Sequence, residues 1–476
     1  MTQSKLSDAD FLAALRAVVG DAYVVTHGPD QDAFLTEPRG LWRGTALAVA
    51  RPATTDEVSR VVALCAAHSR SVTPHGGGTG LVGGQIAHDA RGVTLSLTRL
   101  NKVREIDPAS NTMIVEAGVT LAAAQAAAQG VDRLFALSLA SEGSCTVGGN
   151  LATNAGGTAV LAYGNTRDLT MGVEVVLADG RVMTNLSKLR KDNTGYDLKD
   201  LFVGSEGTLG VITAAVLKLH PRPRSIETAF VGMESPEQAM ALFAMAQARA
   251  GSSLTTFELM PRIGVDFVLK HAEGARDPLA DENEWYALIE LSSTAQSGLD
   301  DVMGGLLESA LEEGLIDDAV VAASVQQRDD FWKLREMLSE VQSREGGSIK
   351  HDVSVPLARV PEFLDVATDA VLELEPKARV VAFGHAGDGN IHFNISQPVG
   401  ADKAAFLARW EEMNAVVHEI VLEMGGSISA EHGVGTLKRD LLPGAKDAAA
   451  LDVMRAIKAA LDPKGIMNPG KVLAPR

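Results

Sequence analysis

Four glycine-rich segments in the first half of the chain constrain its fold more than any other feature of the sequence. They occupy residues 75–84 (HGGGTGLVGG), 141–150 (SEGSCTVGGN), 154–157 (NAGG) and 204–210 (GSEGTLG). Glycine permits tight turns and lets a ligand lie against the main chain, and successive backbone N–H groups in such turns can surround a pyrophosphate. A single Gly-Gly pair is usually only a turn. Four clusters in one half favour a site for an extended, phosphate-containing ligand.

The first segment also has the spacing of a nicotinamide-binding turn. Gly78, Gly80 and Gly83 form a GxGxxG pattern, and residues 71–74 before it are predicted to be a strand. In a dinucleotide-binding turn of that type, the glycines open a helix. Here residues 83–89 continue as loop and then enter another strand, so the pattern argues against a nicotinamide site.

The rest of the chain reads as mixed helices and strands. Thr54 and Glu57 form a capping pattern for a helix whose apolar face carries Val58, Val61, Val62 and Cys65, which places Cys65 in the core. Further strands are predicted at residues 93–97, 113–116, 173–177, 210–219, 285–291, 318–323 and 349–355, and helices at 121–129, 236–250, 298–313, 331–344 and 360–374. The glycine-rich character stops near residues 221–224 (PRPR), where we place a domain boundary.

Length and charge narrow the classes of function. A chain of 476 residues suggests two or three domains, and the net charge of -18 argues against nucleic acid as a partner. Two cysteines, Cys65 and Cys145, provide no disulfide framework, so a cytoplasmic location is expected. Residues 1–20 carry acids in a helical pattern without the apolar core of a signal peptide. The longest uncharged run, residues 143–166, is rich in Gly, Asn and Thr and predicts no membrane span.

His385 and His392 flank a turn that can bring them to one metal ion. On a helix their rings would lie about 10.5 Å apart along the axis, too far for two ligands of one ion. The sequence between them, AGDGNI, instead predicts a tight turn between two strands, with His392 and Asn394 on one strand face. A polar turn with two incidental histidines remains the alternative.

Two other segments offer residues that complete such a site. Glu431 and His432 lie side by side in SAEHGVG, and two His with one Glu form a common set of three metal ligands. Arg335 and Ser339 lie one turn apart on the predicted helix 331–344, and Lys350 lies on the strand 349–355. These three can hold an anion, although solvated charges are the alternative for Arg335 and Lys350.

With these glycine-rich segments the chain resembles flavoproteins of the vanillyl-alcohol-oxidase and p-cresol-methylhydroxylase type over nearly its whole length. The resemblance implies an α+β fold: a two-subdomain FAD-binding domain (residues 1–222), a substrate domain with an antiparallel sheet covered by helices (223–420), and a helical segment that returns to the flavin (421–476). It implies FAD without a covalent link, because Gly and Thr follow Gly76 where other members carry a tethering residue. The implied FAD residues are Pro74, Gly76, Gly77, Gly78, Thr79, Gly80, Leu81, Ser141, Gly143, Ser144, Thr146, Gly149, Asn150, Asn154, Gly156, Glu206, Gly207, Ile212 and Asn468.

The second half resembles the D-2-hydroxy-acid dehydrogenase branch of the same family. The matching segments are FWKLRE (331–336), KHDVSVP (350–356), GHAGDGNIH (384–392), EHGVG (431–435) and DPKGIMNP (462–469). The resemblance implies hydride transfer from a small 2-hydroxy acid to flavin N5, assisted by a divalent metal such as zinc. It implies metal binding by His385, His392 and Glu431, base catalysis by His432, and substrate binding by Arg335, Ser339, Lys350 and Asn394.

Members of that branch place an Arg, a small hydroxyl residue and a Lys on a distal carboxylate, so the resemblance implies that Arg335, Ser339 and Lys350 favour an acid with a second carboxylate, such as D-2-hydroxyglutarate or D-malate. D-lactate or glycolate is the alternative substrate within the same family. The implied electron acceptor is an electron-transfer flavoprotein or a quinone, and a homodimer is compatible with the resemblance. Two readings from other classes stay open at this point: a zinc hydrolase with structural glycine loops, and a non-enzymatic nucleotide-binding protein.

Overall fold

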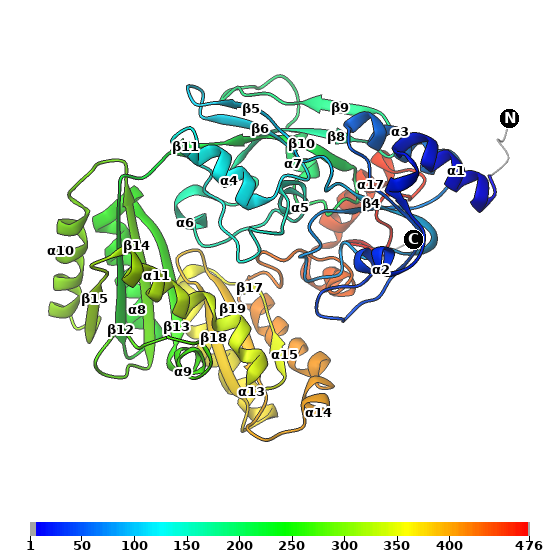
Figure 1. The fold of residues 1–476 in the computed structure, drawn as a ribbon. Helices are drawn as coiled ribbons and strands as arrows, with labels where there is room; N and C mark the ends of the chain where they lie inside the picture. The colour runs from blue at the N-terminus through cyan, green and yellow to red at the C-terminus, as the bar shows by residue number, and fades with distance from the viewer. Residues whose placement is uncertain (1–5, 475–476) are drawn as a thin grey trace. The chain divides into compact units, whose positions relative to one another are not determined.

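The computed structural model describes residues 6–474, which form two compact units (Figure 1). The first unit comprises Met1–Gly156, Gly164–Arg222 and Glu431–Arg476, and the second comprises Gly157–Tyr163 and Pro223–Ala430. The helical pattern expected for residues 1–20 is present as α1 (Asp8–Val19), capped by the Ser7 side chain. Residues 1–5 of that stretch lie outside the described residues.

The first unit contains a four-stranded sheet and a five-stranded sheet. The four-stranded sheet has the order β1-β2-β4-β3 and mixed directions, and the five-stranded sheet has the order β5-β6-β10-β8-β9 and is antiparallel. Strands β7 and β11 form a separate pair. The strands are β1 (Val24–Val25), β2 (Thr45–Ala50), β3 (Val72–His75), β4 (His88–Ser96), β5 (Val103–Asp107), β6 (Thr112–Glu116), β7 (Arg133–Leu134), β8 (Thr170–Val176), β9 (Val182–Asn185), β10 (Val211–Lys218) and β11 (His220–Pro221).

Helices of the first unit accompany these sheets, and two of them, α16 and α17, follow the second unit in the sequence. They are α1, α2 (Pro29–Leu35), α3 (Thr55–His68), α4 (Leu121–Gln129), α5 (Val147–Thr153), α7 (Lys199–Phe202), α16 (Leu442–Ala445) and α17 (Ala448–Leu461), with 3-10 turns η1 (Asp21–Tyr23) and η5 (Arg439–Leu441). The predicted cap of α3 is confirmed, because the Thr54 side chain accepts a hydrogen bond from the Glu57 N–H at 3.2 Å. The predicted apolar face of α3, including Cys65, is buried in the main core of this unit.

The second unit is built on an eight-stranded antiparallel sheet. Its order is β15-β12-β14-β13-β18-β19-β16, and β17 also pairs with β19. The strands are β12 (Ser225–Met233), β13 (Leu254–Pro261), β14 (Trp285–Ser293), β15 (Asp318–Val321), β16 (Ser348–Lys350), β17 (Val353–Ser354), β18 (Arg379–His385) and β19 (Asn390–Ser396). The fold class expected from the resemblance, with an antiparallel sheet and covering helices in this half, is confirmed.

Helices cover this sheet within the second unit (Figure 1). They are α6 (Val160–Tyr163), α8 (Pro236–Ala250), α9 (Arg262–His271), α10 (Leu299–Glu312), α11 (Val325–Glu336), α12 (Leu338–Val341), α13 (Val360–Leu374), α14 (Lys403–Leu407) and α15 (Trp410–Glu423), with 3-10 turns η2 (Gly251–Ser253), η3 (Gln342–Arg344) and η4 (Leu357–Arg359). Apolar residues of α9, α11 and α12 form one core cluster with β12, β13, β14 and β18. In residues 6–474, none of the helices has the length and apolarity needed to cross a bilayer.

The prediction of one helix over residues 331–344 is wrong. Helix α11 begins earlier, at Val325, because the Ser324 side chain caps it by accepting from the Gln327 N–H at 3.2 Å. It ends at Glu336, and the Glu340 N–H then donates to the Met337 carbonyl at 3.0 Å. This bond from i+3 to i tightens the chain, so residues after Met337 continue as the separate short helix α12.

The predicted continuous strand over residues 349–355 is also interrupted. His351 and Asp352 separate β16 from β17. The His351 ring, through Nδ1, bonds to the Phe393 carbonyl at 2.7 Å, and the Asn390 amide donates to the Val353 carbonyl at 2.9 Å. Side chains therefore take up carbonyl groups that a regular ladder would pair with backbone N–H groups.

Candidate functional site

A glycine-lined pocket occupies the first unit. The loop after β3, the N-terminal part of α5 and the segment before β10 form its walls. No helix follows the GxGxxG residues, since the chain passes through loop into β4, as expected. Twelve of the residues expected at FAD line this pocket: Pro74, Gly76, Gly77, Gly78, Thr79, Gly80, Thr146, Gly149, Asn150, Glu206, Gly207 and Ile212. Leu81, Ser141, Gly143, Ser144, Asn154, Gly156 and Asn468 are not among its lining residues.

Several of these glycines are required by close backbone approach. A Cβ on Gly77 would lie 2.0 Å from the Ser144 carbonyl oxygen, and one on Gly76 would lie 2.5 Å from Thr146 Oγ1. Gly78 has φ +74°, a conformation that disfavours other residues. The walls are therefore main chain without side chains, which fits a ligand that lies flat against backbone N–H groups. Such a cradle suits the pyrophosphate and ribose of FAD.

His75 and Cys145 also line the pocket, although neither was expected to bind the cofactor. Burial lowers the pKa of His75 to about 4, so the ring is neutral at pH 7. Cys145 is buried and unpaired with any other cysteine. The signal for His75 was its place at the end of the strand that enters the first glycine-rich segment.

Glu206 connects the pocket wall to the loop that carries Glu431 and His432. Its carboxylate accepts hydrogen bonds from the backbone N–H groups of Val434 at 2.7 Å and Gly435 at 2.8 Å. Gly433 lacks a Cβ at a position where one would lie 2.8 Å from Glu206 Oε1. Burial raises the pKa of Glu206, and the two N–H groups oppose that shift. The side chain thus holds the backbone directly after His432.

The C-terminal segment returns to the same wall within the first unit. The Asn468 side-chain amide donates to the carbonyl oxygens of Gly84 at 3.0 Å and Glu206 at 2.8 Å. Its own Oδ1 is buried and accepts no hydrogen bond from the residues the structure describes. Lys471 is buried nearby, and desolvation together with Arg439 lowers its pKa to about 8, against the opposing effect of Glu206. Asn468 therefore supports the pocket wall from behind.

The predicted turn between His385 and His392 is present. Strands β18 and β19 pair in a register that sets Phe383 opposite His392 and His385 opposite Asn390. Opposite residues in an antiparallel pair point to the same side, so both imidazoles project from one face of the sheet. Their ring centroids are 5.6 Å apart.

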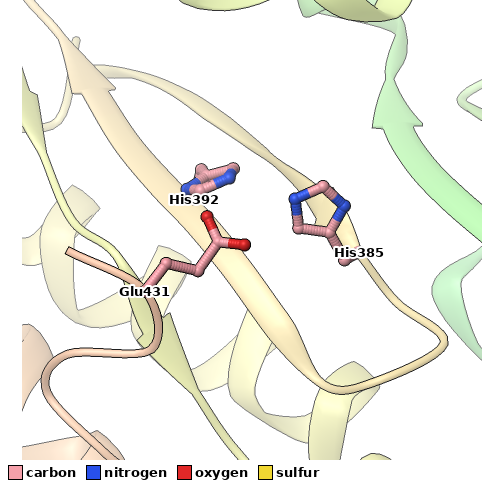
Figure 2. Close-up of side chains that lie close together, drawn as sticks. All are labelled: His385, His392 and Glu431. Atoms are coloured by element: carbon pink, nitrogen blue, oxygen red, sulfur yellow. The ribbon is translucent and has the colours of Figure 1, made fainter. Parts of the chain in front are cut away.

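Glu431 completes a group that could hold a metal ion. It directly follows Ala430, the last residue of the second unit, and the preceding Ser427 exchanges backbone hydrogen bonds of 2.8 and 3.0 Å with Ser354. His385, His392 and Glu431 each offer one ligand atom, and these atoms lie within 4.8 Å of one another. Figure 2 shows the Glu431 carboxylate directed toward the two rings. Asp352, Glu431 and His432 form an overlapping group of the same kind.

The sequence analysis missed a buried carboxylate, that of Glu258, which contacts the His385 ring. Glu258 on β13 is 1% exposed, and its Oε1 lies 2.7 Å from His385 Nδ1. Burial raises the pKa of Glu258, but the interactions with His385 and Arg335 outweigh it and bring the pKa to about 2. The ionised carboxylate accepts from Nδ1–H, which leaves Nε2 of His385 as the ligand atom. A lone acid within the apolar run LTTFELMP was the signal that could have revealed it.

Arg335 forms a hydrogen bond to the same carboxylate, that of Glu258. Its Nε donates to Glu258 Oε2 at 2.7 Å, and its guanidinium lies 4.8 Å from the centroid of the Phe383 ring. It is 7% exposed, so it is a buried ion-pair partner and not a solvated charge. Lys350 and Ser339 lie close together, as expected. The Lys350 side chain, through Nζ, donates to the backbone carbonyl of Ser339 at 2.9 Å.

Asn394 projects from the same sheet face as the imidazoles. Lys350 pairs with Asn394 across β16 and β19, and Asn394 follows His392 by two residues on its strand. Asn394 is 2% exposed, and its Oδ1 accepts no hydrogen bond from the part of the chain that the structure describes. A buried amide oxygen without a protein partner fits a position where a ligand supplies one.

Comparison with known families finds two matching domains. Residues 46–185 match the FAD binding domain, and residues 222–472 match the C-terminal domain of FAD linked oxidases. D-2-hydroxyglutarate dehydrogenase, mitochondrial, from Bos taurus is 39% identical over 98% of this chain and 83% of its own length. D-2-hydroxyglutarate dehydrogenase from Stutzerimonas stutzeri is 34% identical over 98% of this chain and 100% of its own length.

Solved structures share the fold at lower identity. Alkyldihydroxyacetonephosphate synthase superposes with a TM-score of 0.75 at 18% identity, covering 98% of this chain and 86% of its own. A substrate complex of p-cresol methylhydroxylase gives a TM-score of 0.75 at 19% identity, covering 98% and 96%. These likenesses establish the architecture.

Proposed function

Because the chain belongs to the FAD-linked oxidase family, we propose that it is an FAD-dependent dehydrogenase that oxidises D-2-hydroxyglutarate to the 2-oxo acid. Relatives of that activity match nearly its whole length at 34% and 39% identity. The observation that carries the substrate choice is one face of the second unit's sheet. That face bears His385, His392, Asn394 and Lys350, with Arg335 placed over it.

The residues on this face suit the two ends of a hydroxy dicarboxylic acid. His385, His392 and Glu431 would hold a divalent cation, for which two imidazoles and a carboxylate are a common set. When bound, the cation supplies Lewis acidity toward the 2-hydroxyl, and FAD supplies the hydride acceptor. Zinc is the proposed metal, and D-malate is proposed as a second substrate.

The remaining side chains orient the acid and move its proton. Arg335 and Lys350 would pair with the distal carboxylate, for which the planar guanidinium offers a bidentate edge. The Asn394 side-chain NH2 would donate to the C1 carboxylate, and the buried Oδ1, which has no protein donor among the described residues, would accept from the 2-hydroxyl. His432 would accept the hydroxyl proton, since Glu206 holds the backbone directly beyond it.

D-lactate or glycolate oxidation is the second candidate, and one observation favours it. The charge of Arg335 is already balanced by Glu258 at 2.7 Å, which reduces its attraction for a second carboxylate. A monocarboxylic acid would need only the metal ligands and Asn394.

Anaerobic reduction of the bound flavin distinguishes the two candidates. The purified protein should show flavin absorbance that is bleached rapidly by D-2-hydroxyglutarate, more slowly by D-malate and least by D-lactate. Arg335→Ala should slow the reaction with D-2-hydroxyglutarate far more than that with D-lactate. If Arg335→Ala slows the reactions with both acids equally, the monocarboxylic acid becomes the favoured substrate. A purified protein without flavin absorbance would overturn both candidates.

We further propose that electrons leave through an electron-transfer flavoprotein or a quinone. The two unpaired cysteines support the proposal that the protein works in the reducing cytoplasm. FAD is proposed to be bound without a covalent link, and a homodimer is proposed as the assembly. Retention of flavin by the precipitated protein in acid would contradict the non-covalent link, and light scattering of the purified chain tests the dimer.

A further inference from the structure

Glu258 joins two parts of the site that handle opposite ends of the proposed substrate. Its Oε1 lies 2.7 Å from Nδ1 of His385, a proposed metal ligand. Its Oε2 lies 2.7 Å from Nε of Arg335, the proposed anchor of the distal carboxylate. All three side chains are buried within the second unit.

Both neighbours of Glu258 act as hydrogen-bond donors. Arg335 has no acceptor atom, and His385 donates from Nδ1 if Nε2 is to serve a metal. A carboxylate can accept from both at once. An amide of the same size can accept from only one of them, because its NH2 group would face the other donor.

The sheet makes this bridge rigid. Leu259 pairs with Gly384 across β13 and β18, which fixes the adjacent Glu258 and His385 on the same face of the sheet. The Arg335 guanidinium also lies over the Phe383 ring, with its carbon 4.8 Å from the ring centroid. The Glu258 side chain thus bonds to both His385 and Arg335 from a fixed position on the sheet.

We propose that Glu258 is a positioning residue that fixes the distance between the metal-binding end and the anion-binding end of the site, and thereby selects the length of the dicarboxylic acid. This inference rests on the proposed function. Glu258 itself touches neither end of the substrate. Five-carbon D-2-hydroxyglutarate is the acid whose length the bridge favours, and four-carbon D-malate is one methylene too short.

A second, half-buried acid in the same sheet provides a matched control. Glu290 on β14 accepts from Trp332 Nε1 at 2.9 Å and from Thr228 Oγ1 at 3.1 Å. Among the described residues, Glu290 bonds to neither His385 nor Arg335. Glu290→Gln therefore changes a half-buried carboxylate to an amide without changing the proposed bridge.

The first measurement is zinc affinity, determined on the FAD-loaded protein without substrate by competition with a chromophoric chelator. Glu258→Gln should bind zinc about 10- to 100-fold more weakly than the wild type, the usual effect of losing the partner of a ligating histidine. Glu290→Gln should keep the wild-type affinity. An unchanged affinity in Glu258→Gln overturns the proposal.

The second measurement is length selection, taken as the ratio of flavin reduction efficiencies with D-2-hydroxyglutarate and D-malate at saturating zinc. Glu258→Gln should lower this ratio by about tenfold, the scale on which one methylene is discriminated. Glu290→Gln should leave it unchanged. If the ratio stays at its wild-type value in Glu258→Gln, the assignment of length selection is overturned.

A third variant protects the test against misfolding. Glu258→Asp keeps the charge but is one methylene shorter, so it cannot reach both donors, and it should shift both readouts in the same direction as Glu258→Gln. If the wild type is reduced by neither dicarboxylic acid, the proposed function fails. The zinc measurement then still decides whether Glu258 holds His385.

Discussion

Two buried glutamates position histidines of the candidate site through hydrogen bonds. Glu258 bonds directly to the His385 ring, whereas Glu206 bonds to the backbone N–H groups that follow His432. The first arrangement selects which ring nitrogen faces a metal, and the second fixes the loop that carries the proposed base. Neither glutamate needs to reach the substrate to affect catalysis, because each sets the position of another group.

Replacement of His432 tests the base directly. His432→Ala should keep bound FAD and zinc but lose at least about 100-fold in the rate of flavin reduction, the usual contribution of general base catalysis. Stopped-flow reduction at 450 nm measures the rate, and elemental analysis measures the metal. His27→Ala, at an exposed position in the first unit, is the control and should reduce at the wild-type rate. A normal rate in His432→Ala would exclude this residue as the base.

At the level of single residues, the sequence predicted what depends on local spacing. The cap at Thr54 and the turn that brings His385 and His392 to one face both follow from neighbours in the chain. Glu258 was missed because its partners are distant: His385 is 127 residues away and Arg335 is 77. A single sequence does not report such pairings, because burial and register decide them.

The glycine-rich loops form an element whose function depends on missing side chains. Gly77→Ala should lower the FAD content of the purified protein, because the new Cβ would lie 2.0 Å from the Ser144 carbonyl oxygen and push the two loops apart. The ratio of absorbance at 450 and 280 nm measures that content. Gly304→Ala is the control, because Gly304 lies in α10 of the second unit and nothing lies within 4 Å of its added Cβ. Full FAD content in Gly77→Ala would show that the two loops can separate without loss of the site.

Another element-level contact joins α9, η3 and β18 through one carboxylate. Glu345 accepts from Lys270 at 2.6 Å, from His271 at 2.5 Å and from Arg379 at 2.6 Å. The bond from Lys270, with those from Arg379 and His271, lowers the pKa of Glu345 from 4.5 to about 2 in spite of some desolvation. A lowered pKa means that the ionised form stabilises the folded state. This stabilisation is complete above pH 4.5 and disappears as the pH falls toward 2.

Glu345→Gln should therefore lower the free energy of unfolding of the second unit by about 2 kcal/mol at pH 7, and its midpoint by about 5 °C. The gap from the wild type should narrow below pH 4.5. Tryptophan fluorescence follows this unit, because Trp285, Trp332 and Trp410 belong to it. Glu340→Gln is the control: its side chain is 63% exposed and its pair with Arg344 spans 3.5 Å, so the midpoint should hardly move. A gap that stays constant down to pH 3 would contradict the assigned role of Glu345.

Element boundaries were predictable where a cap or a turn marks them. Helices α4, α8 and α13 have the predicted ends, whereas the helix predicted at 331–344 has two breaks in its structure at Met337 and Val341. Apolar periodicity continues across those positions, so the pattern alone could not show that the backbone tightens there. Strand β13 was not predicted, so the position of Glu258 in the sheet could not be predicted either.

At the scale of the whole molecule, the resemblance predicted the fold class. Local sequence pattern could not predict which segments belong to which unit. The described chain enters the second unit first at residues 157–163, where the Thr256 hydroxyl of β13 donates to the carbonyl of Thr158, just before α6, at 3.0 Å. Residues from 431 onward belong to the first unit. Such crossings depend on contacts between distant segments, which composition and periodicity do not reveal.

This division predicts how the two proposed cofactors respond to removal of the metal. The glycine-lined pocket lies wholly in the first unit, whereas His385 and His392 lie in the second. Treatment with a chelator followed by gel filtration should therefore leave FAD bound, with its absorbance at 450 nm unchanged. D-2-hydroxyglutarate should no longer bleach that flavin, and added zinc should restore the reaction, because the proposed substrate hydroxyl depends on the metal for its acidity. Dithionite should reduce the flavin in both forms, which separates loss of catalysis from loss of cofactor. Full bleaching by the acid in a protein shown to be metal-free would remove the metal from the reaction and leave His385 and His392 as direct ligands of the substrate.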